Sequence, residues 1–161
     1  KEAAGGGVSG RRQLRDNLGR SWVKIQEHEA LLTNRFLDGV RELPNVVLYG
    51  KHATECAARS GTYRSRLPSR TPTFALRIRA NNRSNDLAPE AVADWMQRER
   101  GVWCASGNFY ALDLTETLGL EPSGGLVRFG FLHYNTVDEV DRVIEALSLV
   151  SNGSLQLPSS Y

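Results

Sequence analysis

Leu126-Val-Arg-Phe-Gly-Phe-Leu-His-Tyr-Asn-Thr136, followed by Val-Asp-Glu-Val-Asp-Arg142, is more informative than any other segment of the chain. Its apolar side chains alternate on one face, at Val127, Phe129 and Phe131. This alternation predicts a strand whose Arg128 points away from the apolar face. Thr136 and Glu139 have the spacing of a capping box, which predicts a helix beginning at Val137. An always-charged, forked donor on a rigid strand suits recognition of a carboxylate or a phosphate.

The rest of the chain has the periodicity of short helices and strands. Helices are expected over about 18–42, 89–100, 111–118 and 137–150. Strands are expected over 46–49, 73–79, 102–105 and the stretch around Arg128. Pro89 suits a helix start and Gly101 a helix end. We therefore predict an α+β fold, a small, mainly antiparallel sheet with helices on one face. The expected core includes all three tryptophans, Trp22, Trp95 and Trp103.

Composition narrows the classes of function. The chain has 161 residues, 40% of them hydrophobic, and a net charge of +2. So small a net charge gives no broad electrostatic footprint for nucleic acid. No apolar run approaches the roughly 20 residues that span a bilayer. With two cysteines, Cys56 and Cys104, in no dense disulfide pattern, a reduced cytoplasmic setting is expected, with neither nucleic acid nor membrane as partner.

No self-contained catalytic constellation is visible. His28, His52 and His133 lack the spacing that would hold a metal, so no metal site is predicted. Two hypotheses are open for Cys104: it is either a small buried hydrophobic residue or a reactive thiol. The arginine-bearing loop from Arg59 to Arg70 reads either as solvated loop or as a phosphate-binding patch.

Several motifs occur in a meaningful order. They are Leu43–Gly50, Arg70-Thr-Pro-Thr-Phe74, Arg-Glu-Arg-Gly101, Val102–Ala111, Val127–Thr136 and Asp138-Glu-Val-Asp-Arg142. This succession resembles the C-terminal small domain of class V aminotransferases, the cysteine-desulfurase-like branch of fold-type I pyridoxal-phosphate enzymes. The resemblance covers the chain from about Leu18 to Val150.

The resemblance implies a homodimeric enzyme whose N-terminal large domain carries pyridoxal 5′-phosphate on a lysine as a Schiff base. The lysines here are Lys1, Lys24 and Lys51, and none matches the family's lysine motif. The start without methionine suggests a piece of something longer. We therefore expect residues 1–17 to be a flexible remnant or linker from the large domain, 18–150 the small domain and 151–161 a tail. The chain alone should be inactive and hold no catalytic residue, and its cofactor-binding residues are unassigned.

The resemblance also assigns a substrate site. Arg128 aligns with the arginine that grips the α-carboxylate of the amino-acid substrate. Asn108 either lines the substrate pocket or takes a left-handed turn. Tyr110 falls at the position of the desulfurases' nucleophilic cysteine, with Cys104 six residues too early, which argues against persulfide chemistry. Transamination, C–S lyase chemistry and epimerisation stay open within the class. The competing hypothesis is a stand-alone anion-binding or interaction module with no catalysis.

Overall fold

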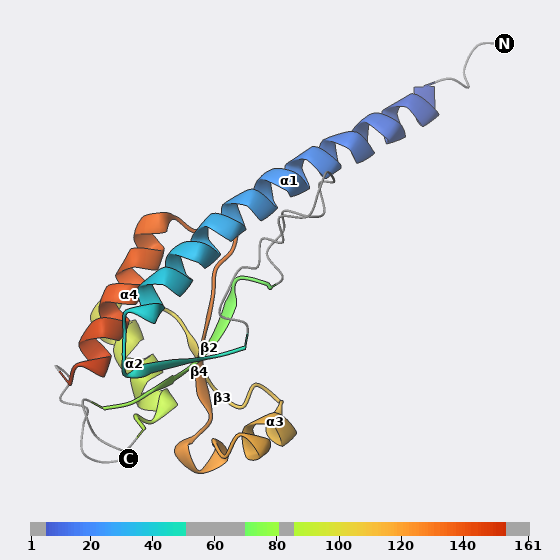
Figure 1. Cartoon of the computed structure of the whole chain (residues 1–161). Coiled ribbons are helices and arrows are strands. Elements are labelled where there is room, and N and C mark those ends of the chain that lie inside the picture. The colour runs from blue at the N-terminus through green and yellow to red at the C-terminus, as the bar shows by residue number, and fades with distance from the viewer. Residues whose placement is uncertain (1–5, 51–69, 81–85, 154–161) are drawn as a thin grey trace.

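The computed structural model describes residues 6–50, 70–80 and 86–153 (Figure 1). The helices are α1 (Gly6–Arg41), α2 (Pro89–Arg100), α3 (Leu112–Thr117), the 3-10 turn η2 (Glu121–Ser123) and α4 (Val137–Ser151). The strands are β1 (Val46–Tyr49), β2 (Thr73–Ile78), β3 (Ala105–Gly107) and β4 (Leu126–Gly130). The predicted α+β class is confirmed.

The strands form one sheet in the order β1-β2-β4-β3, and every pair is antiparallel. In the register between β2 and β4, Phe74 lies opposite Phe129 and Leu76 opposite Val127. Because side chains alternate along a strand, these four share one face of the sheet. The same pairing puts Arg128 opposite Ala75, on the other face. The predicted direction of Arg128 is therefore confirmed.

Helices α1, α2 and α4 contribute buried side chains to the core on the Phe74 face. At its centre, the Phe36 ring of α1 lies 4.3 Å from the Phe74 ring, 6.2 Å from Phe129 and 5.3 Å from Phe131, measured between centroids. Offset and edge contacts of this kind add to the burial of large aromatic side chains. Figure 1 shows α3 on the side of the sheet away from α1 and α4.

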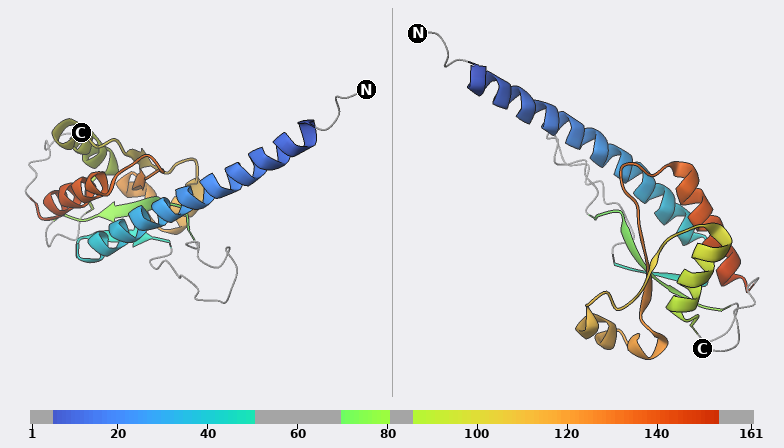
Figure 2. Two further views of the ribbon diagram at one scale, coloured as in Figure 1. Left: turned by 90° about the horizontal axis from the view of Figure 1, so that it is seen from above. Right: turned by 180° about the vertical axis from the view of Figure 1, so that it is seen from behind.

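Helix α1 begins at Gly6, well before the expected start near Leu18. Residues 6–17 are therefore part of a helix. The predicted division into a linker from a large domain, a small domain and a tail stays a prediction. Only the C-terminal half of α1 packs on the sheet, and the N-terminal half projects beyond it (Figure 2). This explains why Trp22, 58% exposed, is not in the core as expected.

The boundaries of the other elements follow local rules. Thr136 accepts a hydrogen bond from the backbone N–H of Glu139, whose carboxylate accepts one from the Thr136 N–H, so the predicted capping box is present. Gly101 is left-handed at the end of α2, and the Val102 N–H donates to the Met96 carbonyl. Because this helix-ending motif occupies the first residues after α2, β3 begins at Ala105 rather than at the expected residue 102. In the described ranges, no helix combines the length and apolarity needed to cross a membrane.

Candidate functional site

Arg128 is exposed on the face of the sheet opposite the Phe74 face, which is called the open face below, and it lies between two small residues. On β4 it pairs with Ala75 of β2 on one side and with Ala105 of β3 on the other. Cross-strand neighbours on one face are close enough to touch, so large residues there would crowd the guanidinium. Two methyl groups instead leave space around it. Strand β4 thus holds the Arg128 backbone rigidly and leaves space around the guanidinium.

The charge of Arg128 is available for a ligand. Among the described residues, no carboxylate pairs with it. Arg77 of β2, on the same face, offers a contrast, because its Nε donates to the Asp86 carboxylate at 2.7 Å. That bond is the main reason why the pKa of Arg77 is raised. Of these two cations on the open face, Arg128 is the one left to meet an external anion.

Arg128 has one aromatic contact. The central carbon of its guanidinium lies 4.5 Å from the centroid of the Phe109 ring. Such a cation–π contact contributes about 0.5–1 kcal/mol at an exposed site. A guanidinium stacked on a ring keeps its N–H edges available for in-plane hydrogen bonds, which is the geometry that a carboxylate accepts.

Phe109 and Tyr110 are left-handed, with φ of 55° and 62°. A left-handed residue other than glycine costs about 1–2 kcal/mol, and such outliers gather at functional sites. The turn is held from both sides. The Asn108 side-chain oxygen accepts the Tyr110 N–H at 3.2 Å, and the Asn108 carbonyl accepts the Ala111 N–H at 2.8 Å. Gly125 packs against Gly107, which precedes the turn, so closely that a Cβ on Gly125 would collide with the carbonyl oxygen of Gly107.

These bonds bear on the two hypotheses for Asn108. The left-handed conformation that the second hypothesis placed at Asn108 falls instead on Phe109 and Tyr110, so that hypothesis is wrong in position. The side-chain oxygen of Asn108 is already used inside the turn. Its substrate-binding role stays a prediction, and the groove beside Arg128 is lined without it.

A groove of about 670 Å³ opens beside Arg128. Its lining comes from α1, from the first residues of β2 and β3 and the segments before them, and from β4 and the turn after it: Glu29, Thr71, Pro72, Thr73, Trp103, Cys104, Ala105, Arg128, Gly130, Phe131 and Leu132. Trp103 is 80% exposed at this groove, which corrects the expectation that it belongs to the core. Trp95 does pack against the core as expected. The volume is ample for an amino-acid-sized ligand.

Cys104 lies in the wall of the groove, and burial raises the pKa of its thiol to about 11. A nucleophilic thiol must be ionised near neutral pH, and burial in apolar surroundings prevents this. Of the two hypotheses for Cys104, the partly buried position packed against the core favours the small hydrophobe. Tyr110, at the position expected for a desulfurase cysteine, is fully exposed.

The turn after β4 is structural. Asn135 accepts the Leu132 N–H through its side chain at 2.8 Å, and its own carbonyl lies 2.8 Å from Nε2 of His28 on α1. His28 thus ties α1 to this turn, while His133 and Tyr134 are exposed beside each other. The prediction that this segment is a turn is confirmed.

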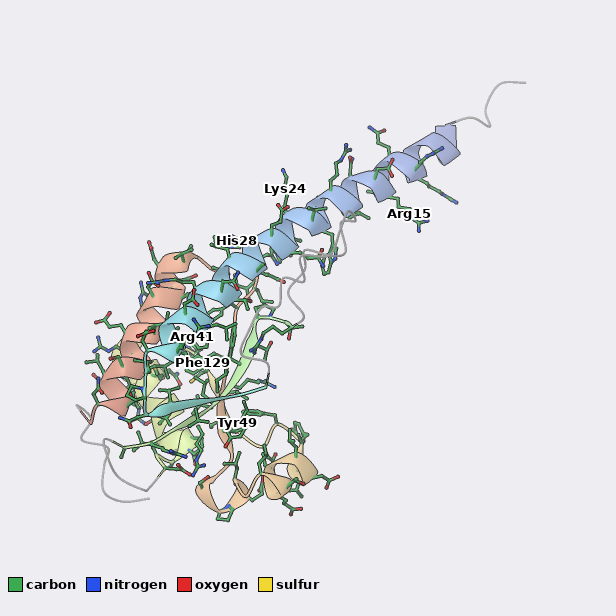
Figure 3. All side chains as sticks on the ribbon, in the orientation of Figure 1. Arg15, Lys24, His28, Arg41, Tyr49 and Phe129 are labelled. Carbon is green, nitrogen blue, oxygen red and sulfur yellow. The ribbon has the colours of Figure 1, made fainter. Side chains whose placement is uncertain are left out.

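The other candidate cations lie elsewhere. Residues 59–69 of the predicted arginine-bearing loop are outside the described residues. Arg70 donates to the Thr73 carbonyl at 2.6 Å and stacks over the Phe74 ring at 4.3 Å. Lys1 and Lys51 are also outside the described ranges, and Lys24 projects from α1 (Figure 3).

Sequence reasoning found Arg128 but missed its two aromatic neighbours in the site. Nothing in Gly107-Asn-Phe-Tyr-Ala111 marks Phe109 as the contact of Arg128, because the contact depends on a rare backbone conformation. The exposure of Trp103 depends equally on where β3 begins. Only the run of a small residue, asparagine and two aromatics signals a tight turn there.

No protein-family model matches the chain. A curated relative, the aminotransferase-like protein FGM3 of Gibberella zeae, is 28% identical over 136 residues. The match covers 84% of this chain and 29% of the relative, so the chain corresponds to less than a third of that protein's length. This similarity supports an aminotransferase-like relationship for the chain.

Proposed function

We propose that this chain is the C-terminal small domain of a pyridoxal-phosphate-dependent enzyme of the class V aminotransferase type, and that Arg128 binds the α-carboxylate of its amino-acid substrate. The observation that carries the proposal is the Arg128 guanidinium on the open face of the sheet, which has no carboxylate partner among the described residues. Ala75 and Ala105 lie beside it and a groove lies next to it. The similarity to an aminotransferase-like protein agrees with this assignment.

The geometry suits a substrate carboxylate well. A bidentate pair between guanidinium and carboxylate fixes two oxygen atoms in one plane, and so orients the Cα substituents of an amino acid. Charged hydrogen bonds of this type contribute about 1.5–3 kcal/mol each. Because β4 is a central strand, paired on both sides, the backbone of Arg128 is fixed relative to the rest of the fold.

The groove fits the substrate rather than the cofactor. Among the described residues, its lining includes no lysine, and its charged members are Glu29 and Arg128. The group that joins pyridoxal phosphate to the protein must therefore come from outside the groove, in our proposal from a preceding large domain. When bound, the cofactor supplies an electron sink for bonds at Cα. The residues described here bind and orient the substrate and help to exclude water.

The site also bears on the reaction. A cysteine desulfurase needs a thiolate near the substrate, whereas Tyr110 stands at the expected position and the pKa of Cys104 is about 11. We therefore propose an enzyme without persulfide chemistry. Transamination, C–S lyase chemistry and epimerisation all use the same carboxylate grip, and the groups that choose among them belong to the cofactor-bearing part.

The test begins with colour. The protein expressed from its complete reading frame should be yellow, and borohydride reduction should remove the visible absorbance. Addition of L-alanine should perturb that absorbance. A colourless full-length protein that still binds carboxylates through Arg128 would overturn the enzyme proposal and favour the stand-alone anion-binding module.

A further inference from the structure

We propose that Phe109 is a positioning residue for Arg128, and that the left-handed Phe109–Tyr110 turn exists to hold its ring against the guanidinium. The inference rests on the proposed function for the role of Arg128 as carboxylate ligand. It adds a second residue to the site, one that neither the motifs nor the relative assigns. Its basis is the contact of 4.5 Å and the two unusual backbone angles.

The side chain of Arg128 has little lateral support from its cross-strand neighbours. Its neighbours on the open face are Ala75 and Ala105, whose methyl groups reach too short a distance to restrain a long side chain. An arginine on a strand without lateral support samples many rotamers, and ligand binding must suppress them. The Phe109 ring supplies the missing support, because it fixes the plane of the guanidinium before a ligand arrives.

The backbone conformation of Phe109 and Tyr110 is unusual for aromatic residues. A turn with negative φ would place no strain on Phe109 and Tyr110. Where φ is positive, glycine is the usual residue. The chain instead keeps two aromatics there, and three separate contacts hold the turn: the bond to Asn108, the bond from Ala111 and the close approach of Gly125 to Gly107. Backbone strain that several contacts maintain in this way is expected where the side chain has a function.

The side chains of Phe109 and Tyr110 differ in exposure. The Phe109 ring is partly buried against Arg128, whereas Tyr110 is fully exposed. The two therefore share a backbone conformation and differ in their relation to the guanidinium. This makes Tyr110 a matched control, since its replacement disturbs the same turn without removing the ring beneath Arg128.

The test uses the chain of 161 residues, labelled with ¹⁵N, and reads the Nε–Hε signal of Arg128. In the wild type, ring current should shift the Arg128 Hε resonance upfield. Phe109→Leu keeps an apolar side chain but removes the aromatic face, so the shift should disappear. Phe109→Trp should retain it, and Tyr110→Leu should leave it unchanged. An Hε shift that survives Phe109→Leu would overturn the proposal without any assumption about function.

Binding gives the second readout. Titration of the complete protein, with its cofactor bound, with L-alanine should show an affinity about two- to fivefold weaker for Phe109→Leu than for the wild type, which is the size of an exposed cation–π contact. Phe109→Trp should restore the affinity, and Tyr110→Leu should match the wild type. Equal losses for Phe109→Leu and Tyr110→Leu would assign the effect to the turn rather than the ring, and would overturn the proposal.

Arg128→Lys distinguishes the two levels of the argument. If this variant binds L-alanine as the wild type does, the proposed function fails. If it binds more weakly while Phe109→Leu binds normally, the proposed function stands and Phe109 has no positioning role. Should Phe109→Leu unfold, Phe109→Tyr must retain both the Hε shift and the affinity, and a loss of either would overturn the proposal.

Discussion

The state of Cys104 decides whether the groove can perform thiol chemistry. Burial raises the pKa of this thiol from 9.0 to about 11. At pH 8, a shift of two units lowers the thiolate fraction about a hundredfold, and the thiolate is the form that reacts. We therefore expect iodoacetamide to alkylate native Cys104 about a hundredfold more slowly than the same residue in urea-unfolded protein.

The assay measures the alkylation rate by mass spectrometry between pH 7 and 10 in a Cys56→Ser background, which leaves Cys104 as the one thiol. Limited access alone would slow the reaction equally at every pH, so the pH profile separates access from ionisation. The native rate should rise tenfold for each pH unit throughout this range, whereas the unfolded protein should level off near pH 9. Cys104→Ser must abolish labelling. A native profile that levels off at or below pH 9 would show that burial does not raise the pKa of Cys104, and persulfide chemistry would again be open.

The remaining predictions concern the framework that holds the site. Gly39→Ala should destabilise the protein by about 1 kcal/mol although alanine favours helices, because a Cβ at Gly39 would collide with Ile144 on α4. In an Ile144→Ala background the same substitution should stabilise by about 1 kcal/mol in urea unfolding, and a gain in both backgrounds would show that no collision exists. Thr136→Ala should cost about 1 kcal/mol through the lost cap, with Thr136→Ser as the control that keeps it. The pKa of Glu139 is lowered, first by the Thr136 backbone N–H and then by Asn135, so the stability it contributes is present above pH 4.5 and lost as the pH falls. Glu139→Gln should flatten the fall of the melting temperature below pH 4.5, and an unchanged profile would remove Glu139 from this role.

Much of the fold was predictable because local patterns and tertiary packing agree. The alternation of Phe74, Leu76 and Ile78 gave the strand and its buried face, and both hold in the sheet. Pro89 and Gly101 bound α2 as predicted. The capping box placed the start of α4 at Val137. In each case, one short-range rule is sufficient to set the boundary.

The parts that could not be predicted depend on contacts distant in sequence or on rare backbone states. The N-terminal half of α1 is helical without packing on the sheet, so an apolar stripe there gave no guide to burial, and Trp22 is exposed. Trp103 is exposed because the chain leaves α2 in a left-handed turn and pairs only from Ala105. The direction of Arg128 followed from alternation, but its contact with Phe109 required two left-handed aromatics that no propensity favours.

Recognition of a carboxylate by Arg128 can be tested with a pair of ligands that differ in this group alone. L-alanine and ethylamine can be titrated into the complete protein with its cofactor bound, with the visible absorbance as the signal. Arg128→Ala should weaken the binding of L-alanine about 10- to 100-fold, the value of a lost charge-assisted pair, and leave ethylamine unaffected. Arg79→Ala, which removes an exposed arginine just beyond β2, is the matched control and should change neither. An equal loss for both ligands, or no loss for L-alanine, would show that Arg128 does not bind the carboxylate.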